Sequence, residues 1–187
     1  MIPTITPEEI TAGYAEMASR YVDEGWIPYL TTFMFQQLGG SPTSVGRQME
    51  RDVERVYERF VTRVRRYPRT RRASGQLPIW IGNPDFPVFK YARVSLEDVS
   101  INDGQHVHAF CLQPPRSRLK VDVPTHFEVE KELYVRPDYP LARIHVVPVT
   151  HDVEKVMAYV LKAMLRGRVG ADATFILPRH RSELPRR

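Results

Sequence analysis

The segment between Ser41 and Pro68 constrains the fold of this 187-residue chain more than any other. Ser41 followed by Pro42 is typical of a helix start, and Pro68 ends the segment. Apolar residues recur along it at steps of three and four, namely Val45, Met49, Val53, Val56, Phe60 and Val64. Charged residues occupy the other side. Because such a helix buries one stripe only, it must pack against a second layer.

Elements of both kinds surround this helix. A capping box at Thr6-Pro7-Glu8-Glu9 predicts a helix that runs to about Asp23 and stops at Gly25. Strands are predicted over 29–35, 77–81, 87–101, 105–112 and 141–149, and a further helix over 153–165. Residues 126–135 fit either a strand or a short helix.

The order of these elements predicts an α+β fold with a central antiparallel sheet and flanking helices. The turn signal Asn102-Asp103-Gly104 further predicts that residues 90–112 form a hairpin. We divide the chain into an N-terminal helix at 1–25, a main domain at 26–170 and a basic, poorly structured tail at 171–187.

Composition limits the compartment and the partners. Cys111 is the only cysteine, so neither an intrachain disulfide nor a thiolate zinc cluster is expected. The chain has no signal-peptide pattern and no apolar run of the roughly 20 residues that cross a bilayer, which predicts a cytoplasmic protein without a membrane partner. The net charge of +5 suits a polyanion such as DNA, although the arginines clustered within 63–72 and 179–187 also fit a solvated surface with a basic end.

Two histidines, His106 and His108, stand one residue apart on the predicted 105–112 strand. Alternate side chains of a strand share a face, so the two imidazoles can bind one metal ion together. In the predicted hairpin, Glu97 is a diagonal neighbour on that face and Asp98 points away. Because a one-residue shift of register reverses this choice, Glu97 is favoured as third ligand and Asp98 is kept as the alternative. This ligand set suits Mn²⁺ or Mg²⁺.

The histidine pair also allows other interpretations. An isolated His-x-His strand can simply carry two partly exposed polar residues. Cupins also use His-x-His, but they need a glutamate four or five residues further along. Leu112 and Gln113 stand there instead, so a cupin is disfavoured.

Tyr159 lies on the predicted 153–165 helix, nearly opposite its apolar stripe. Lys155, Lys162 and Arg166 share its side, which gives a cationic strip suited to a phosphate backbone; an ordinary surface tyrosine among lysines is the alternative. Tyrosine has a pKa of about 10, so its attack on a phosphodiester requires a polarised phosphate and nearby positive charge. Lys162 could supply that charge.

In this order the motifs resemble those of the HUH single-strand endonucleases, in particular the Rep-type initiators of rolling-circle replication with one catalytic tyrosine. The apolar strand Leu30–Phe35 matches their first motif, His106-Val107-His108 the second, and Tyr159 with Lys162 the third. The resemblance covers roughly residues 29–166. Single-tyrosine transposases, which carry a glutamine where this chain has Lys162, fit less well.

The resemblance implies an HUH-type nuclease fold and site-specific nicking and joining of single-stranded or hairpin DNA through a 5′-phosphotyrosine intermediate. By this nicking the protein would initiate replication of a plasmid, phage or related mobile element. His106, His108 and Glu97 would hold the metal, Tyr159 would be the nucleophile and Lys162 would support it. The chain has no Gly-x-x-x-x-Gly-Lys-Ser/Thr loop, so it would either use a host helicase as a partner or act as a nuclease domain only.

Two other functions stay open. One is a basic nucleic-acid-binding protein or regulator that has the same fold without catalysis. The other is a small zinc-dependent enzyme unrelated to DNA that uses the two histidines. Only cleavage separates the first from a nuclease, because both would bind DNA with a similar dependence on salt.

Overall fold

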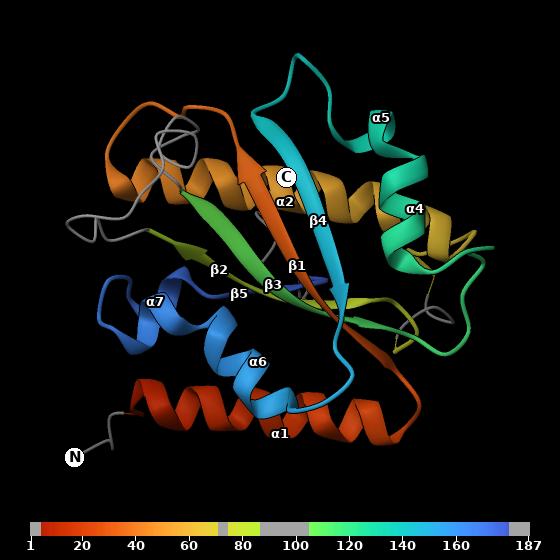
Figure 1. The fold of residues 1–187 in the computed structure, drawn as a ribbon, viewed down its shortest axis with the longest axis horizontal. Helices are drawn as coiled ribbons and strands as arrows, with labels where there is room; N and C mark the ends of the chain where they lie inside the picture. The colour runs from red at the N-terminus through yellow and green to blue at the C-terminus, as the bar shows by residue number, and fades with distance from the viewer. Residues whose placement is uncertain (1–4, 71–74, 87–104, 180–187) are drawn as a thin grey trace.

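A five-stranded antiparallel sheet forms the centre of the computed structural model, which describes residues 5–70, 75–86 and 105–179. The strands are β1 (Ile27–Phe35), β2 (Ile79–Asp85), β3 (His106–Gln113), β4 (Leu141–Pro148) and β5 (Phe175–Leu177). They lie in the order β4-β1-β3-β2-β5, as Figure 1 shows. The expected α+β fold with a central antiparallel sheet is therefore confirmed.

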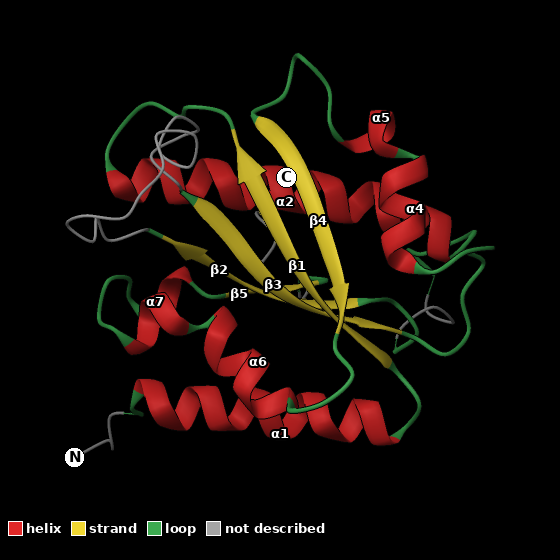
Figure 2. Ribbon diagram, viewed as in Figure 1, coloured by secondary structure: helices red, strands yellow, loops and turns green. Residues whose placement is uncertain are grey.

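Helices cover the sheet from both sides (Figure 2). They are α1 (Pro7–Asp23), α2 (Pro42–Val64), α4 (Val123–Val129), α5 (Lys131–Tyr134), α6 (Val153–Val160), α7 (Lys162–Leu165) and the 3₁₀ turn η3 (Ala171–Ala173). One layer contains α2, α4 and α5, and the other contains α1, α6 and α7. From β1 to β4 the described elements follow the β-α-β-β-α-β order of the ferredoxin-like motif.

The apolar stripe predicted for α2 packs the α2 layer against the sheet. Ser41 caps α2 by accepting a hydrogen bond from the Ser44 N–H, and Pro42 occupies the first turn. All six residues of the apolar stripe are buried. Trp80 of β2 lies at the centre of this cluster, with its ring 5.6 Å from that of Phe60 and 5.1 Å from that of Tyr57. Burial of these aromatic rings stabilises this layer.

The second layer is built around the other face of β3. Phe110 and Leu112 point from β3 into a cluster with Ala18 of α1 and with Met157 and Val160 of α6. Alternation along β3 then places the two preceding even-numbered residues, the histidines, on this same face. The layer with α1, α6 and α7 therefore determines what surrounds the histidine pair.

Several element boundaries differ from those predicted. The predicted 153–165 helix breaks at Leu161 into α6 and α7, and residues 126–135 belong mostly to α4 and α5. Strand β2 continues to Asp85, beyond the predicted end at Ile81. The predicted strand over 87–101 lies outside the described residues.

Part of the predicted basic tail is ordered into the sheet. Residues 175–177 form β5, which pairs antiparallel with Trp80–Gly82 of β2, so a poorly structured tail from residue 171 onward is wrong for this segment. Arg179, just beyond β5, makes ion pairs with Glu50 and Glu54 of α2. Among the described helices, none is both long enough and apolar enough to span a membrane.

Candidate metal centre

The two histidines meet a carboxylate where β2 ends and β3 begins. In the antiparallel register, Asp85 is the direct neighbour of His106, and Asn83 is the neighbour of His108. Directly opposed residues of two strands share a face, so Asp85 projects alongside both imidazoles. Ligand atoms of Asp85, His106 and His108 all lie within 4.8 Å of one another.

The ligand atoms converge on one place. The Nε2 atoms of His106 and His108 are 2.8 Å apart. Asp85 Oδ2 lies 3.3 Å from His106 Nε2 and 3.8 Å from His108 Nε2. Asp85 and His108 are buried, whereas His106 is partly exposed. Two imidazoles and one carboxylate form the donor set that leaves open positions on a divalent transition metal.

Lys162 contributes a positive charge to the same cluster. Its Nζ lies 2.7 Å from Asp85 Oδ2 and 3.4 Å from His108 Nε2. Lys162 is the first residue of α7, and the break at Leu161 turns its side chain toward the end of β2. The cluster therefore draws on three elements, β2, β3 and α7.

Electrostatics keep the carboxylate charged and one imidazole neutral. Burial alone would raise the pKa of Asp85, but hydrogen bonds from His106 and Lys162 and the charge of Lys162 outweigh it, so the pKa of this carboxyl is well below its usual range. Burial, followed by the charges of His106 and Lys162, lowers the pKa of His108 to about 3. A neutral imidazole and an ionised carboxylate are the forms that bind metal.

Tyr159 lies next to this cluster. Its ring centroid is 4.7 Å from that of His108, and Lys162 Nζ lies 4.1 Å from the centroid of the tyrosine ring. The side chain is 45% exposed, so solvent and a ligand can reach it. Residues separated by about fifty positions in the sequence are thus brought into contact by the packing of α6 against β3.

The structure describes four of the predicted site residues and leaves two others outside the described ranges. His106, His108, Tyr159 and Lys162 come together around one point. Glu97 and Asp98 lie outside the described residues, and their role as ligands stays a prediction. Strand β3 pairs with β1 on one side and with β2 on the other. Among the described residues, the carboxylate that faces the histidines is Asp85.

Sequence reasoning missed Asp85, although a signal was present. Continuing the 77–81 strand through Gly82-Asn83-Pro84-Asp85 would have set Ile81, Asn83 and Asp85 on one face by simple alternation. Pro84 argues against a strand interior because it cannot donate to a ladder. Here β5 covers β2 only at Trp80–Gly82, so Pro84 lies where β2 is an edge strand.

The residues of this cluster fit a divalent metal ion. Asp85 Oδ1 is buried and has no hydrogen-bond partner among the described residues, which is costly for an ionised carboxylate unless a cation or water completes its shell. Imidazole nitrogens together with a carboxylate favour Mn²⁺ over Mg²⁺, and zinc is also compatible with them.

Beside the cluster, the sheet face continues over β1 and β4. The register aligns Asp85, His106, Met34 and Arg143 in one row across the strands, and Asn83, His108, Thr32 and His145 in the next. Arg143 and His145 are exposed. At the usual spacing of adjacent strands, Arg143 lies about 10 Å from His106. A polar, partly basic surface thus extends from the cluster to the edge of the sheet.

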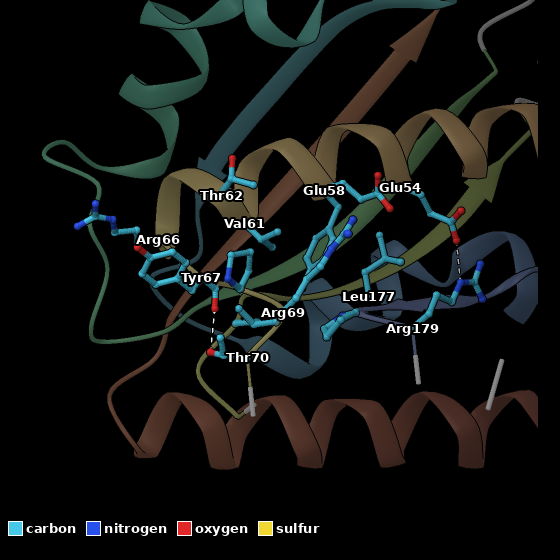
Figure 3. Close-up of a pocket in the computed structure, with 14 residues that line it drawn as sticks. Glu54, Glu58, Val61, Thr62, Arg66, Tyr67, Arg69, Thr70, Leu177 and Arg179 are labelled. Carbon is cyan, nitrogen blue, oxygen red and sulfur yellow. Dashed lines mark hydrogen bonds and ion pairs between the residues drawn. The ribbon is translucent and has the colours of Figure 1, made fainter. Parts of the chain in front are cut away.

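A cavity of about 560 Å³ lies elsewhere, against α2 and β5 (Figure 3). Tyr57, Val61 and Leu177 form apolar walls, and Glu58 and Arg69 line it as well. Tyr57, Val61 and Leu177 belong to the core cluster of the α2 layer, on the opposite side of the sheet from the histidines. This cavity is therefore separate from the candidate metal centre.

Comparisons of the chain with models of known protein families, with curated proteins and with solved structures give no match. Any function must therefore be argued from the geometry of the site.

Proposed function

We propose that this protein is a metal-dependent endonuclease that nicks and rejoins single-stranded DNA, with Tyr159 as nucleophile. Asp85, His106 and His108 are the proposed metal ligands. Lys162 is the proposed supporting cation. The expected activity is thus that of a Rep-type initiator, with Asp85 as the carboxylate.

The observation that carries this proposal is the contact between Tyr159 and His108, with ring centroids 4.7 Å apart. A tyrosine that merely packs on a helix surface has no reason to lie against a buried cluster of metal-binding type. A nucleophile, in contrast, must stand beside the group that polarises the phosphate. The 45% exposure of Tyr159 leaves room for a strand to approach.

The chemistry divides among the residues as follows. A bound metal would polarise the scissile phosphate through its non-bridging oxygens. The Tyr159 oxygen attacks phosphorus in line, a new phosphorus–oxygen bond forms, and the bond to the 3′ oxygen breaks. The proton lost from the tyrosine is balanced by the proton that the leaving 3′ oxygen takes up. Lys162, 4.1 Å from the tyrosine ring, stabilises the developing negative charge.

The neighbouring sheet surface supports a nucleic-acid strand as the substrate. Arg143 and His145 are exposed on the same face as the cluster, and Thr32 and Met34 lie between them and the histidines. Phosphate contacts from basic side chains position a strand, and apolar or aromatic side chains stack on its bases. The net charge of +5 favours the same partner.

The test is incubation of the protein with labelled single-stranded DNA oligonucleotides and Mn²⁺, followed by a denaturing protein gel. A covalent protein–DNA band is expected from the wild type and is expected to be absent without metal. Tyr159→Phe should lose the band and keep DNA binding. Tyr67→Phe is the matched control, because Tyr67 is exposed and lies by the cavity away from the cluster.

Two results would contradict the proposal. A band that survives in Tyr159→Phe would show that another residue is the nucleophile. The absence of any band over a broad oligonucleotide pool, with DNA still bound, would favour the non-catalytic nucleic-acid-binding protein instead.

A further inference from the structure

The second nitrogen of His108 has a partner of its own. Thr32 Oγ1 of β1 lies 3.1 Å from His108 Nδ1. β1 and β2 flank β3 on opposite sides, so Thr32 approaches the imidazole from the side away from Asp85. The buried ring of His108 is therefore held between a hydroxyl at Nδ1 and the cluster at Nε2.

The contacts at Nε2 determine how the proton is placed. Lys162 Nζ lies 3.4 Å from His108 Nε2, and an ammonium group can only donate. Lys162 can donate there only to a His108 Nε2 that carries the lone pair, and His106 Nε2, 2.8 Å from the same atom, is then the donor in the contact between the two imidazoles. A neutral imidazole has one N–H, which must then be on Nδ1. The Thr32 oxygen is its acceptor.

We propose that Thr32 is a positioning residue, which fixes His108 in the Nδ1–H tautomer and so presents the Nε2 lone pair to the metal. This inference rests on the proposed metal site, because the tautomer matters only if Nε2 is a ligand. Ligating histidines are commonly oriented by a hydrogen bond at the other ring nitrogen. Here the acceptor is a hydroxyl from the neighbouring central strand.

The location of Thr32 suits this task. β1 is hydrogen-bonded on both sides, to β3 and to β4, so its backbone is fixed within the sheet. Threonine is branched at Cβ, so it has few favoured χ1 rotamers and its hydroxyl has little freedom. A side chain on an exposed loop would hold the ring less firmly.

The test compares Thr32→Val, which keeps the shape and removes the hydroxyl, with Thr32→Ser, which keeps the hydroxyl. Nitrogen-15 NMR of the imidazole reports the tautomer of His108, and calorimetric titration with Mn²⁺ alone reports metal affinity. In Thr32→Val the Nδ1–H tautomer should lose population, and Mn²⁺ affinity should fall by roughly 10- to 100-fold. Thr32→Ser should retain most of both properties.

Thr31→Val is the matched control, since it makes the same change one residue along β1 on the opposite, α2-facing side of the sheet. It should leave the tautomer and the Mn²⁺ affinity unchanged. A Thr32→Val protein with wild-type tautomer and wild-type Mn²⁺ affinity would overturn the inference. If the wild type itself failed to bind Mn²⁺, the proposed metal function would fail, and the NMR comparison alone would decide the role of Thr32.

Discussion

Lys162 Nζ lies 2.7 Å from Asp85 Oδ2, so α7 is joined to the end of β2 by an ion pair whose carboxylate is 5% exposed. The same oxygen belongs to the group of atoms that could hold a metal. The ammonium and a divalent cation would therefore compete for one carboxylate, unless the metal binds through Oδ1.

Replacing Lys162 by methionine should have opposite effects on binding and on cleavage. Removal of the competing ammonium should raise Mn²⁺ affinity, by about tenfold if the ion pair opposes metal binding by about 1.4 kcal/mol. DNA cleavage should fall, because the positive charge beside Tyr159 is lost. Calorimetry and the cleavage assay measure the two effects separately. Lys155→Met is the control, since Lys155 is exposed and pairs with Asp152 instead. Weaker Mn²⁺ binding in Lys162→Met would refute the competition between the ammonium and the metal for Asp85.

Asp85→Asn distinguishes the carboxylate in the described cluster from the one expected at Glu97. The amide keeps the size of the side chain and removes its charge, so Mn²⁺ affinity should drop by about 100-fold. Glu97→Gln should leave the affinity within about twofold if Asp85 is the ligand. Calorimetric titration of both variants decides between them, and the reverse ranking would restore Glu97 as the third ligand.

The free energy of unfolding should decrease in acid because of His108. Its pKa of about 3 in the folded state lies below the ordinary value of 6.5, so between these values the unfolded chain binds a proton that the folded chain does not. Stability should be full above about pH 6.5 and should fall toward pH 3, with a slope approaching 1.4 kcal/mol per pH unit. The lowered pKa of Asp85 acts in the same direction below about pH 4.

Urea unfolding without metal, from pH 7 to pH 4, checks this dependence. His108→Asn should flatten the pH profile, whereas His151→Asn, at an exposed position, should keep the wild-type slope. An unchanged slope in His108→Asn would assign the acid sensitivity to another group.

Two glycine substitutions should change stability in opposite directions. A Cβ added to Gly82 would collide with the ring of Phe175, the residue that pairs with it on β5, so Gly82→Ala should cost roughly 1–3 kcal/mol. Gly46 lies inside α2 with nothing within 4 Å of an added Cβ, so Gly46→Ala should stabilise by about 1 kcal/mol. Thermal unfolding measures both, and a stable Gly82→Ala protein would mean that β5 can move off β2.

Elements with strong local signals were predictable. The capping box at Thr6 and the proline after Ser41 fix where α1 and α2 begin, and a regular stripe fixes which side of α2 is buried. Strand β5 was missed because three residues are too few to show alternation, and it forms only because β2 offers a free edge. Local sequence carries no information about that edge.

The site was predictable in its residues on β3 and on α6 and α7, and less so in its carboxylate. Histidine spacing and the polar side of the helix are local properties, so His106, His108 and Tyr159 could be chosen as candidates directly from the sequence. Glu97 is expected beside the histidines only if the strand nearest in sequence pairs with β3 there. In the described residues that neighbour is β2, so Asp85 faces His106 across about twenty positions of sequence.

The contacts around His108 join residues that are far apart in the sequence. The hydrogen bond to Thr32 joins residues 76 positions apart, and the contact with Lys162 joins residues 54 positions apart. Such contacts form only in the folded chain, because the assembled sheet offsets the loop-closure entropy that is lost when distant residues are brought together. An ion bound there would recognise the folded chain alone, and at a hundred times its dissociation constant it would add about 2.7 kcal/mol to the stability of the whole domain.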